Sequence, residues 1–275
     1  MRVSMWSSFF IEMSPEQMAE TMAARGWRYS ELSDEHAKVL LERGNITETA
    51  EKFKSFCDDL GLSFPQGHFY LTINIAHPDP KIRTKLLDDF KSWCELFNIL
   101  DIQAGVLHPG GAGWPDNSDK QQIMDTILDS LTIIDRYVEG TPTTVCLENM
   151  RNLPVGCSVD DLLELTAPFS SDNFGICLDT GHLVLARGEC AGFIHKAGAK
   201  LKALHIADNM GVNDDHIFPF SGGVVPWKEA MTALKDINYQ GLFNFEVPGE
   251  RCPQPLSFHK LDYALKLGRW MCRDS

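Results

Sequence analysis

Short apolar runs recur along the chain, each followed by a polar or glycine-bearing loop and then by an amphipathic stretch. Several of the runs are apolar throughout instead of alternating, which is typical of parallel strands covered on both faces. The third run has the least definite start, because the polar residues 66–68 before it could already belong to the strand. The predicted strands are Val3–Trp6, Tyr29–Leu32, Phe69–Ile75, Ile102–Leu107, Thr144–Leu147, Gly175–Leu178, Ala203–Ile206 and Leu242–Phe245.

The stretches between these runs carry helix signals. Ser14 is placed to cap a helix that starts at Pro15, with Gln17 at the capping-box position, and Gly61 is placed to end another. Further helices are predicted over residues 46–60, 79–97, 118–138 and 255–271, and from residues 158 and 226 onward. Eight strands alternating with helices predict one α/β domain across residues 1–275, a single (β/α)8 TIM barrel. A doubly wound open sheet is the alternative, but no GxGxxG follows any run.

Composition narrows the class of protein. The 275 residues carry 25 basic and 38 acidic side chains, a net charge of −13, which disfavours a nucleic acid as partner. No apolar run approaches the ~20 residues that a membrane helix needs. The first residues make a poor signal peptide, and none of the eight cysteines stands in a CxxC pair. We therefore expect a cytoplasmic protein with reduced cysteines and no membrane partner.

Polar residues follow the last four predicted strands, where a barrel places its chemistry. Glu148, Asp179, His205 and Glu246 stand at these four ends. Each one alone is more simply a helix cap or a solvated loop charge. Together on one rim, three carboxylates would repel one another unless a cation lay among them. A mixed carboxylate and imidazole set suits Mn²⁺, Zn²⁺, Co²⁺ or Fe²⁺, and suits Mg²⁺ less well. The pattern predicts a divalent metal site at the C-terminal ends of the strands.

Further polar side chains stand near the same predicted rim. His68 precedes the third run, His108 follows the fourth and His182 follows the sixth, while Asp214 and His216 lie in the long loop after the seventh. A histidine in such a place is often a hydrogen-bonded rim residue and not a ligand.

Aromatic residues could wall a pocket at this rim. Trp6, Phe69 and Trp114 stand near predicted strand ends, although packing in the barrel core explains each of them equally well. Asp215 fits an ordinary surface loop.

The segments GHFYLTINIAHP, LHPGG, CLENM, ICLDTGH, LHIADN, NDDHIFPFSGGVVPW and YQGLFNFEV span residues 67–247. In this order they resemble the xylose isomerase-like barrel superfamily, which includes sugar-phosphate isomerases and epimerases, ketose 3-epimerases and zinc AP endonucleases. The resemblance implies that Glu148, Asp179, His205 and Glu246 ligate one divalent metal. It also implies that His182 contacts the substrate in the sugar enzymes and a metal in the endonucleases.

The resemblance leaves both branches of the superfamily open. His68, His108, Asp214 and His216 match positions that ligate extra zinc ions in the endonucleases, so all nine positions of a three-zinc site hold suitable residues. Against the nuclease, residues 149–151 read Asn-Met-Arg where the endonucleases have Thr-Ala-Gly, and the chain is acidic. Against a ketose 3-epimerase, the sixth residue after His205 is glycine, where the epimerases commonly have arginine.

We therefore expect a metal-dependent isomerase or epimerase acting on a small-molecule sugar, a sugar phosphate or an inosose-like compound. Glu148 and Glu246 would be the acid–base pair in proton transfer through a metal-bound cis-enediolate, with His182, His108, His68 and Trp114 at the substrate. The alternatives are a multi-zinc AP endonuclease or phosphodiesterase, a dehydratase or lyase on the same scaffold, and a non-enzymatic sugar-binding protein. Acidic barrels of this kind commonly pair, so a homodimer is the expected assembly.

Overall fold

The computed structural model describes residues 1–115, 117–249 and 253–274. Its strands form one parallel sheet in the order β7-β6-β5-β4-β3-β2-β1-β8. Beyond the end of β7, the Ile206 amide donates to the Asn244 carbonyl (2.8 Å) and the Glu246 amide donates to the Ile206 carbonyl (3.2 Å), which joins the two edges. The barrel is therefore closed, as the sequence predicts. The strands are β1 Arg2–Trp6, β2 Tyr29–Leu32, β3 Ser63–His68, β4 Ala104–Leu107, β5 Thr144–Glu148, β6 Phe174–Asp179, β7 Leu201–His205 and β8 Leu242–Phe245.

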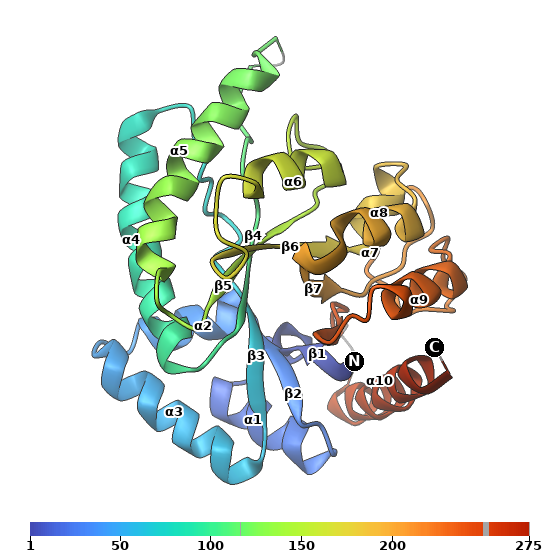
Figure 1. Cartoon of the computed structure of the whole chain (residues 1–275). Coiled ribbons are helices and arrows are strands. Elements are labelled where there is room, and N and C mark those ends of the chain that lie inside the picture. Colours follow the sequence, from blue (N-terminus) through green and yellow to red (C-terminus); the bar gives the residue numbers. More distant parts are fainter. Residues whose placement is uncertain (116, 250–252, 275) are drawn as a thin grey trace.

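Helices surround the strands, and α10 packs beside β1 near the N-terminus (Figure 1). The predicted caps are present: Ser14 and Gln17 exchange side-chain-to-backbone hydrogen bonds, and Gly61 has the left-handed φ of 65° that ends α3. The described helices are α1 Pro15–Ala24, α2 Asp34–Leu41, α3 Ile46–Leu60, α4 Pro80–Ile99, α5 Lys120–Val138, α6 Val159–Thr166, α7 Thr180–Leu185, α8 Cys190–Ala197, α9 Trp227–Asp236 and α10 Gln254–Asp274, with short 3-10 turns at Ser7–Phe10 and Gly198–Lys200. Within the described ranges, no helix combines the length and the apolar character that crossing a membrane requires.

The interior of the barrel is divided into a polar half and a half of small apolar residues. On β4 to β7 it holds the cluster Ala104, Val106, Cys146, Cys177 and Ala203. The strands β1, β2, β3 and β8 instead carry the buried polar residues Ser4, Glu31, Gln66 and Asn244. Contacts between strands that are not neighbours show that some of these polar side chains point inward: Gln66 on β3 donates to the Leu204 carbonyl on β7.

Two glycines let α4 approach the outer face of the sheet. Gly67 and Gly105 are partners in the β3–β4 register. A Cβ on Gly105 would lie 2.4 Å from the Phe69 ring, and one on Gly67 would lie 2.9 Å from the Phe97 ring. The Phe69 ring is stacked on Phe97 with their centroids 4.4 Å apart. The absence of both side chains therefore makes room for aromatic packing under α4.

The third strand was predicted in the wrong place. It runs over Ser63–His68, whereas residues 69–75, predicted as the strand, form a turn-containing loop. Phe69, Ile73 and Ile75 of that loop are buried outside the sheet, whereas Leu71 is exposed. Phe69 packs on α4 and is fully buried, so it does not wall a pocket at the rim. The strand itself is polar because Gln66 points into the barrel interior and His68 lies at the rim beside Glu148.

The aromatic packing at Gly105 yields a stability prediction. We expect Gly105→Ala to lower the free energy of unfolding by about 1–3 kcal/mol, the usual cost of overpacking a close-packed site. Gly192→Ala is the control, because its added Cβ would come within 3 Å of only the flexible end of Glu189. Denaturant unfolding of the three proteins measures the difference, and equal midpoints for wild type and Gly105→Ala would contradict it.

Candidate metal centre

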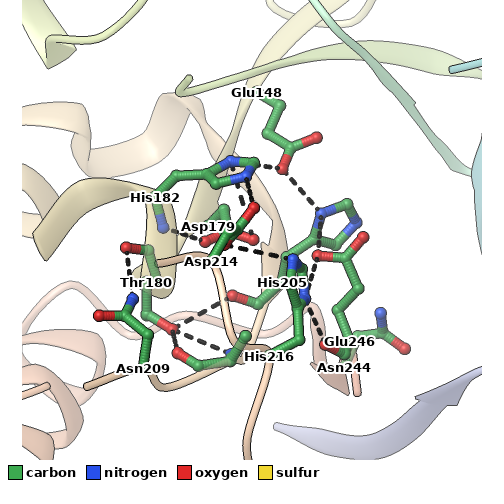
Figure 2. A network of polar contacts seen from close by, with 12 residues as sticks. Glu148, Asp179, Thr180, His182, His205, Asn209, Asp214, His216, Asn244 and Glu246 are labelled. Atoms are coloured by element: carbon green, nitrogen blue, oxygen red, sulfur yellow. Dashed lines mark hydrogen bonds and ion pairs between the residues drawn. The ribbon is translucent and has the colours of Figure 1, made fainter. Parts of the chain in front are cut away.

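Four side chains meet at the C-terminal ends of neighbouring strands. Glu148 ends β5, Asp179 ends β6, His205 ends β7, and Glu246 directly follows β8. All four are buried, and one ligand atom from each lies within 4.8 Å of the others. Figure 2 shows these side chains pointing toward one another from separate strands. The barrel thus brings together the four residues that the sequence predicts as one ligand set.

His205 lies at the centre of this group. Its Nδ1 is 3.1 Å from Glu148 Oε1 and 3.3 Å from Glu246 Oε2. Its Nε2 points the other way and lies 3.0 Å from an oxygen of Glu31, a residue of β2 that the sequence did not bring into the predicted site. The two ring nitrogens therefore face different carboxylates.

The donor set fits a divalent cation. Asp179 Oδ2 and Glu246 Oε2 are buried oxygens that accept no hydrogen bond within the described part of the chain. Burying a carboxylate oxygen that accepts no hydrogen bond is costly, and a cation among these oxygens would remove that cost. The nitrogen of His205 beside carboxylate oxygens suits Mn²⁺, Zn²⁺ or Co²⁺.

Glu148 links this group to further histidines. Its Oε2 lies 3.2 Å from His108 Nε2 and 3.4 Å from His68 Nε2. Its Oε1 lies 3.4 Å from His182 Nδ1 in addition to the contact with His205. His68, Glu148 and His205 also form a set of mutually close ligand atoms. One carboxylate is therefore shared by four imidazoles.

A second group of close ligand atoms adjoins the first. It comprises His182, Asp214 and His216. Asp214 Oδ2 lies 3.1 Å from His182 Nε2, and Asp214 Oδ1 lies 3.3 Å from His216 Nε2. His216 Nδ1 is 2.8 Å from the carbonyl oxygen of Glu246, which ties this group to the end of β8. All nine predicted polar residues therefore lie in one connected cluster.

Local hydrogen bonds hold Asp179 and His182 in place. Asp179 Oδ1 accepts from the His182 amide (2.6 Å) as the N-cap of α7. The side chain of Asn149 bridges β5 and β6, donating to the Asp179 carbonyl (3.0 Å) and accepting from its amide (2.8 Å). The LDTGH and LENM segments thus fix each other at the rim.

Asp208 anchors the long loop that carries the second group. It accepts hydrogen bonds from the amide of Val225 (3.0 Å) and from Trp227 Nε1 (2.8 Å). These bonds fold the loop back over the end of β7, so that Asp214 and His216 reach the rim.

Burial and neighbouring charges separate the pKa values of the two glutamates. Burial raises the pKa of Glu246 to about 8, aided by the charges of Glu148 and Asp179 and opposed by His205 and His216. Burial acts in the same direction on Glu148, but the charge of His205 and hydrogen bonds from surrounding histidines hold the pKa of Glu148 well below its usual range.

Burial and neighbouring charges also shift the pKa values of the histidines. Burial opposes protonation of each, but the carboxylates around them raise the pKa of His182 to about 12, of His216 to about 10 and of His68 to about 9. Burial lowers the pKa of His108. Most of these imidazoles are therefore protonated on both nitrogens and positively charged at neutral pH when no metal is bound.

Two tryptophans remain outside this cluster. Trp114 is half-buried and donates through Nε1 to the Ala76 carbonyl (2.6 Å), with no hydrogen bond or ring contact to the nine residues among those described. Trp6 ends β1 and is half-buried. A substrate contact by Trp114 stays a prediction.

The sequence pointed to neither Arg151 nor Glu31 as part of the site. Arg151 Nε lies 3.5 Å from Asp214 Oδ2, which places a cation beside the second group. The sequence did contain one indication for Glu31, because it is an acidic residue inside a strand that was predicted to be buried.

Metal binding should release protons. At pH 7 the metal-free chain holds protons on Nδ1 of His205 and on Glu246, because carboxylates around His205 and burial of Glu246 raise their pKa values, and ligation requires these atoms without protons. Affinity for Co²⁺ should therefore fall as pH is lowered from 9 to 6. Calorimetric titration with Co²⁺ in two buffers of different ionisation enthalpy should give more than one proton released per ion at pH 7. Identical apparent enthalpies in both buffers would contradict this.

Several curated proteins are similar to part of the chain. An uncharacterised protein of Methanocaldococcus jannaschii is 28% identical over 63% of this chain and 60% of its own length. A probable endonuclease 4 of Persephonella marina is 26% identical over 59% of this chain and 52% of its own length. A D-psicose 3-epimerase of Enterocloster bolteae is 26% identical over 61% of this chain and 56% of its own length. The matched part thus spans about half to three fifths of each relative.

The fold is similar to solved structures over nearly its whole length. A D-psicose 3-epimerase of Clostridium cellulolyticum, crystallised with D-tagatose, superposes with a TM-score of 0.84, covers 99% of each chain and is 18% identical. The family model described as xylose isomerase-like TIM barrel matches residues 19–272. By its strands, its rim and this match, the chain belongs to the xylose isomerase-like TIM-barrel family.

Proposed function

We propose that this protein is a divalent-metal-dependent sugar isomerase or epimerase that moves a proton at the carbon beside a carbonyl. The observation that carries the proposal is the meeting of Glu148 and Glu246, from β5 and β8, at one buried imidazole nitrogen. The similarity to the Enterocloster D-psicose 3-epimerase supports a small sugar as substrate.

Glu148, Asp179, His205 and Glu246 would hold the cation. When bound, it would supply positive charge that stabilises the negative charge developing on the carbonyl and adjacent hydroxyl oxygens of the sugar. Each remaining step falls to side chains of this chain.

The two glutamates are suited to opposite tasks. Glu148, with its depressed pKa, is unprotonated at neutral pH and can accept a proton from carbon. Burial raises the pKa of Glu246 to about 8 in the metal-free chain, so Glu246 has the higher affinity for a proton and is the carboxylate suited to return one. Two carboxylates whose surroundings push their pKa values apart form a general base and a general acid. Their positions on strands β5 and β8 allow removal and return of the proton at different faces of the sugar.

The histidines would take separate roles. His108 and His182 keep part of their side chains exposed, 21% and 9%, and would hydrogen-bond substrate oxygens. His68 is 2% exposed, and its Nδ1 lies 2.6 Å from the Phe69 carbonyl while its Nε2 faces Glu148. We therefore expect His68 to position Glu148 and not to touch the sugar.

Replacement of Glu246 tests the proposed acid. Glu246→Gln should keep an oxygen ligand and the shape of the site but lose the transferable proton. We expect deuterium exchange from heavy water into a panel of ketoses and ketose phosphates, followed by NMR, to slow by ~10²–10⁴. Glu229→Gln, an exposed position on α9, is the control. Equal exchange rates in wild type and Glu246→Gln would reduce Glu246 to a metal ligand.

A multi-metal phosphodiesterase is the second candidate. It is favoured by one observation: eight of the nine polar residues form three groups of close ligand atoms, and two of these groups share Glu148 and His205. The similarity to the Persephonella probable endonuclease 4 agrees with it. In that case the groups around Asp214 and around His68 would hold additional cations that bind a phosphodiester.

Metal stoichiometry separates the two candidates. We expect one tightly held metal ion per chain after dialysis, and we expect Asp214→Asn to retain it. The proposed sugar chemistry requires only the ligand set of Glu148, Asp179, His205 and Glu246. Elemental analysis gives the count, and assays of ketose exchange and of abasic-DNA nicking give the activity. Three zinc ions per chain, with one lost in Asp214→Asn, together with DNA nicking and no ketose exchange would overturn the sugar reaction in favour of the phosphodiesterase.

A further inference from the structure

Glu31 is a carboxylate in the interior of the barrel, beneath the candidate metal centre. It stands on β2 and is fully buried. Its Oε1 lies 3.0 Å from Nε2 of His205, which reaches it from β7 on the other side of the barrel. Within the described part of the chain, His205 is its one ion-pair partner. No lysine or arginine there offsets the cost of burying this charge.

The other oxygen of Glu31 is held by a fixed amide. Asn244 on β8 donates through Nδ2 to Glu31 Oε2. The Glu31 carboxylate only accepts, which turns the NH₂ of Asn244 toward it, and Asn244 Oδ1 then accepts from the Ser4 hydroxyl on β1 (2.8 Å). Ser4, Asn244, Glu31 and His205 are all fully buried and come from four different strands. This chain of hydrogen bonds leaves Glu31 one orientation, with Oε1 toward His205.

We infer that Glu31 is the positioning residue that makes His205 a metal ligand through Nδ1. A carboxylate only accepts hydrogen bonds, so Glu31 holds a proton on Nε2 of His205, while Nδ1, which also faces carboxylates, would give up its proton to a bound cation. The lone pair then lies on Nδ1, which faces Glu148 and Glu246. The negative charge of Glu31 also makes the imidazole a stronger donor to a cation, as carboxylates behind ligating histidines do. The inference rests on the proposed metal dependence but not on the identity of the reaction.

A purely structural role for Glu31 makes a different prediction. If its purpose were to stabilise the barrel, its replacement would change the free energy of unfolding and leave the intrinsic metal affinity of the folded protein unaltered. A positioning role requires the affinity to change in protein that remains folded. Metal affinity and the protonation of His205 therefore distinguish the two roles.

Two replacements separate the charge from the hydrogen bond. In Glu31→Gln the new carbonyl can still accept from His205, and Asn244 can satisfy the new NH₂ by turning its amide, because the Ser4 hydroxyl can also accept. This variant removes the charge alone. Glu31→Met removes both the charge and the acceptor at similar volume. Ser30→Ala is the control: Ser30 is the buried neighbour on β2, and its hydroxyl donates to the backbone carbonyls of Met5 and Glu31 but to no side chain of the cluster.

The measurements use the full chain without substrate. We expect calorimetric titration with Mn²⁺ to show affinity lowered 10- to 100-fold in Glu31→Met, less in Glu31→Gln, and unchanged in Ser30→Ala. In the Zn²⁺-loaded wild type, ¹⁵N NMR of His205 should show a proton on Nε2 and the metal on Nδ1. If folded Glu31→Met binds Mn²⁺ as tightly as the wild type does, the inference is overturned. If Glu31→Met does not fold, a proton on Nδ1 in the wild-type spectrum would overturn it.

The outcome is separable from that of the proposed reaction. Wild type that binds Mn²⁺ but exchanges no sugar proton would refute the proposed sugar chemistry and leave the role of Glu31 standing. Conversely, ketose exchange with unaltered affinity in Glu31→Met would retain the reaction and refute the role of Glu31.

Discussion

Repulsion among buried carboxylates dominates the open end of this barrel. Glu31, Glu148, Asp179 and Glu246 lie within reach of one imidazole or of one another, at positions with almost no solvent exposure. In a medium of low dielectric constant these charges cannot all persist without compensation. The histidines that surround Glu148 provide part of it by carrying protons. A divalent cation would provide the rest, so binding of a cation would change the number of protons that the site holds.

The same constraint explains why the interior is not uniformly apolar. A barrel interior is ordinarily filled by branched apolar residues in layers. Here β1, β2 and β8 contribute Ser4, Glu31 and Asn244, which form a chain of hydrogen bonds that ends at Nε2 of His205. The small residues on β4 to β7, such as Cys146 and Ala203, fill the other half. The polar half extends the rim chemistry downward into the core.

Much of the architecture and the clustering of the four residues of the candidate metal centre could be predicted from the sequence, because both depend on local signals. Apolar runs located seven of the eight strands, and polar residues at the ends of the runs pointed to Glu148, Asp179, His205 and Glu246. The third strand was misplaced because its inward positions, Gln66 and His68, are polar. Periodicity therefore pointed to the apolar loop beyond it.

The residues that were missed depend on non-local geometry. Glu31 occupies a strand whose inward face is identified only once β7 is known to lie across from β2. The direction of a loop tryptophan such as Trp114 is set by its bond to the Ala76 carbonyl, far from it in sequence. No spacing rule along the chain encodes either relation.

The cap formed by Asp179 has a consequence for how many positions a cation would have free. One oxygen of Asp179 is already committed to the first turn of α7, which leaves the other as a one-point ligand. Glu148 is divided in the same manner, with one oxygen turned to His68 and His108. If each of the four residues contributes a single atom, an ion that favours about six ligands retains two open positions. Two adjacent oxygens of a hydroxy-carbonyl compound would fill them as a chelate, so the denticity of the aspartate, and not the width of the pocket, would select for vicinal oxygens.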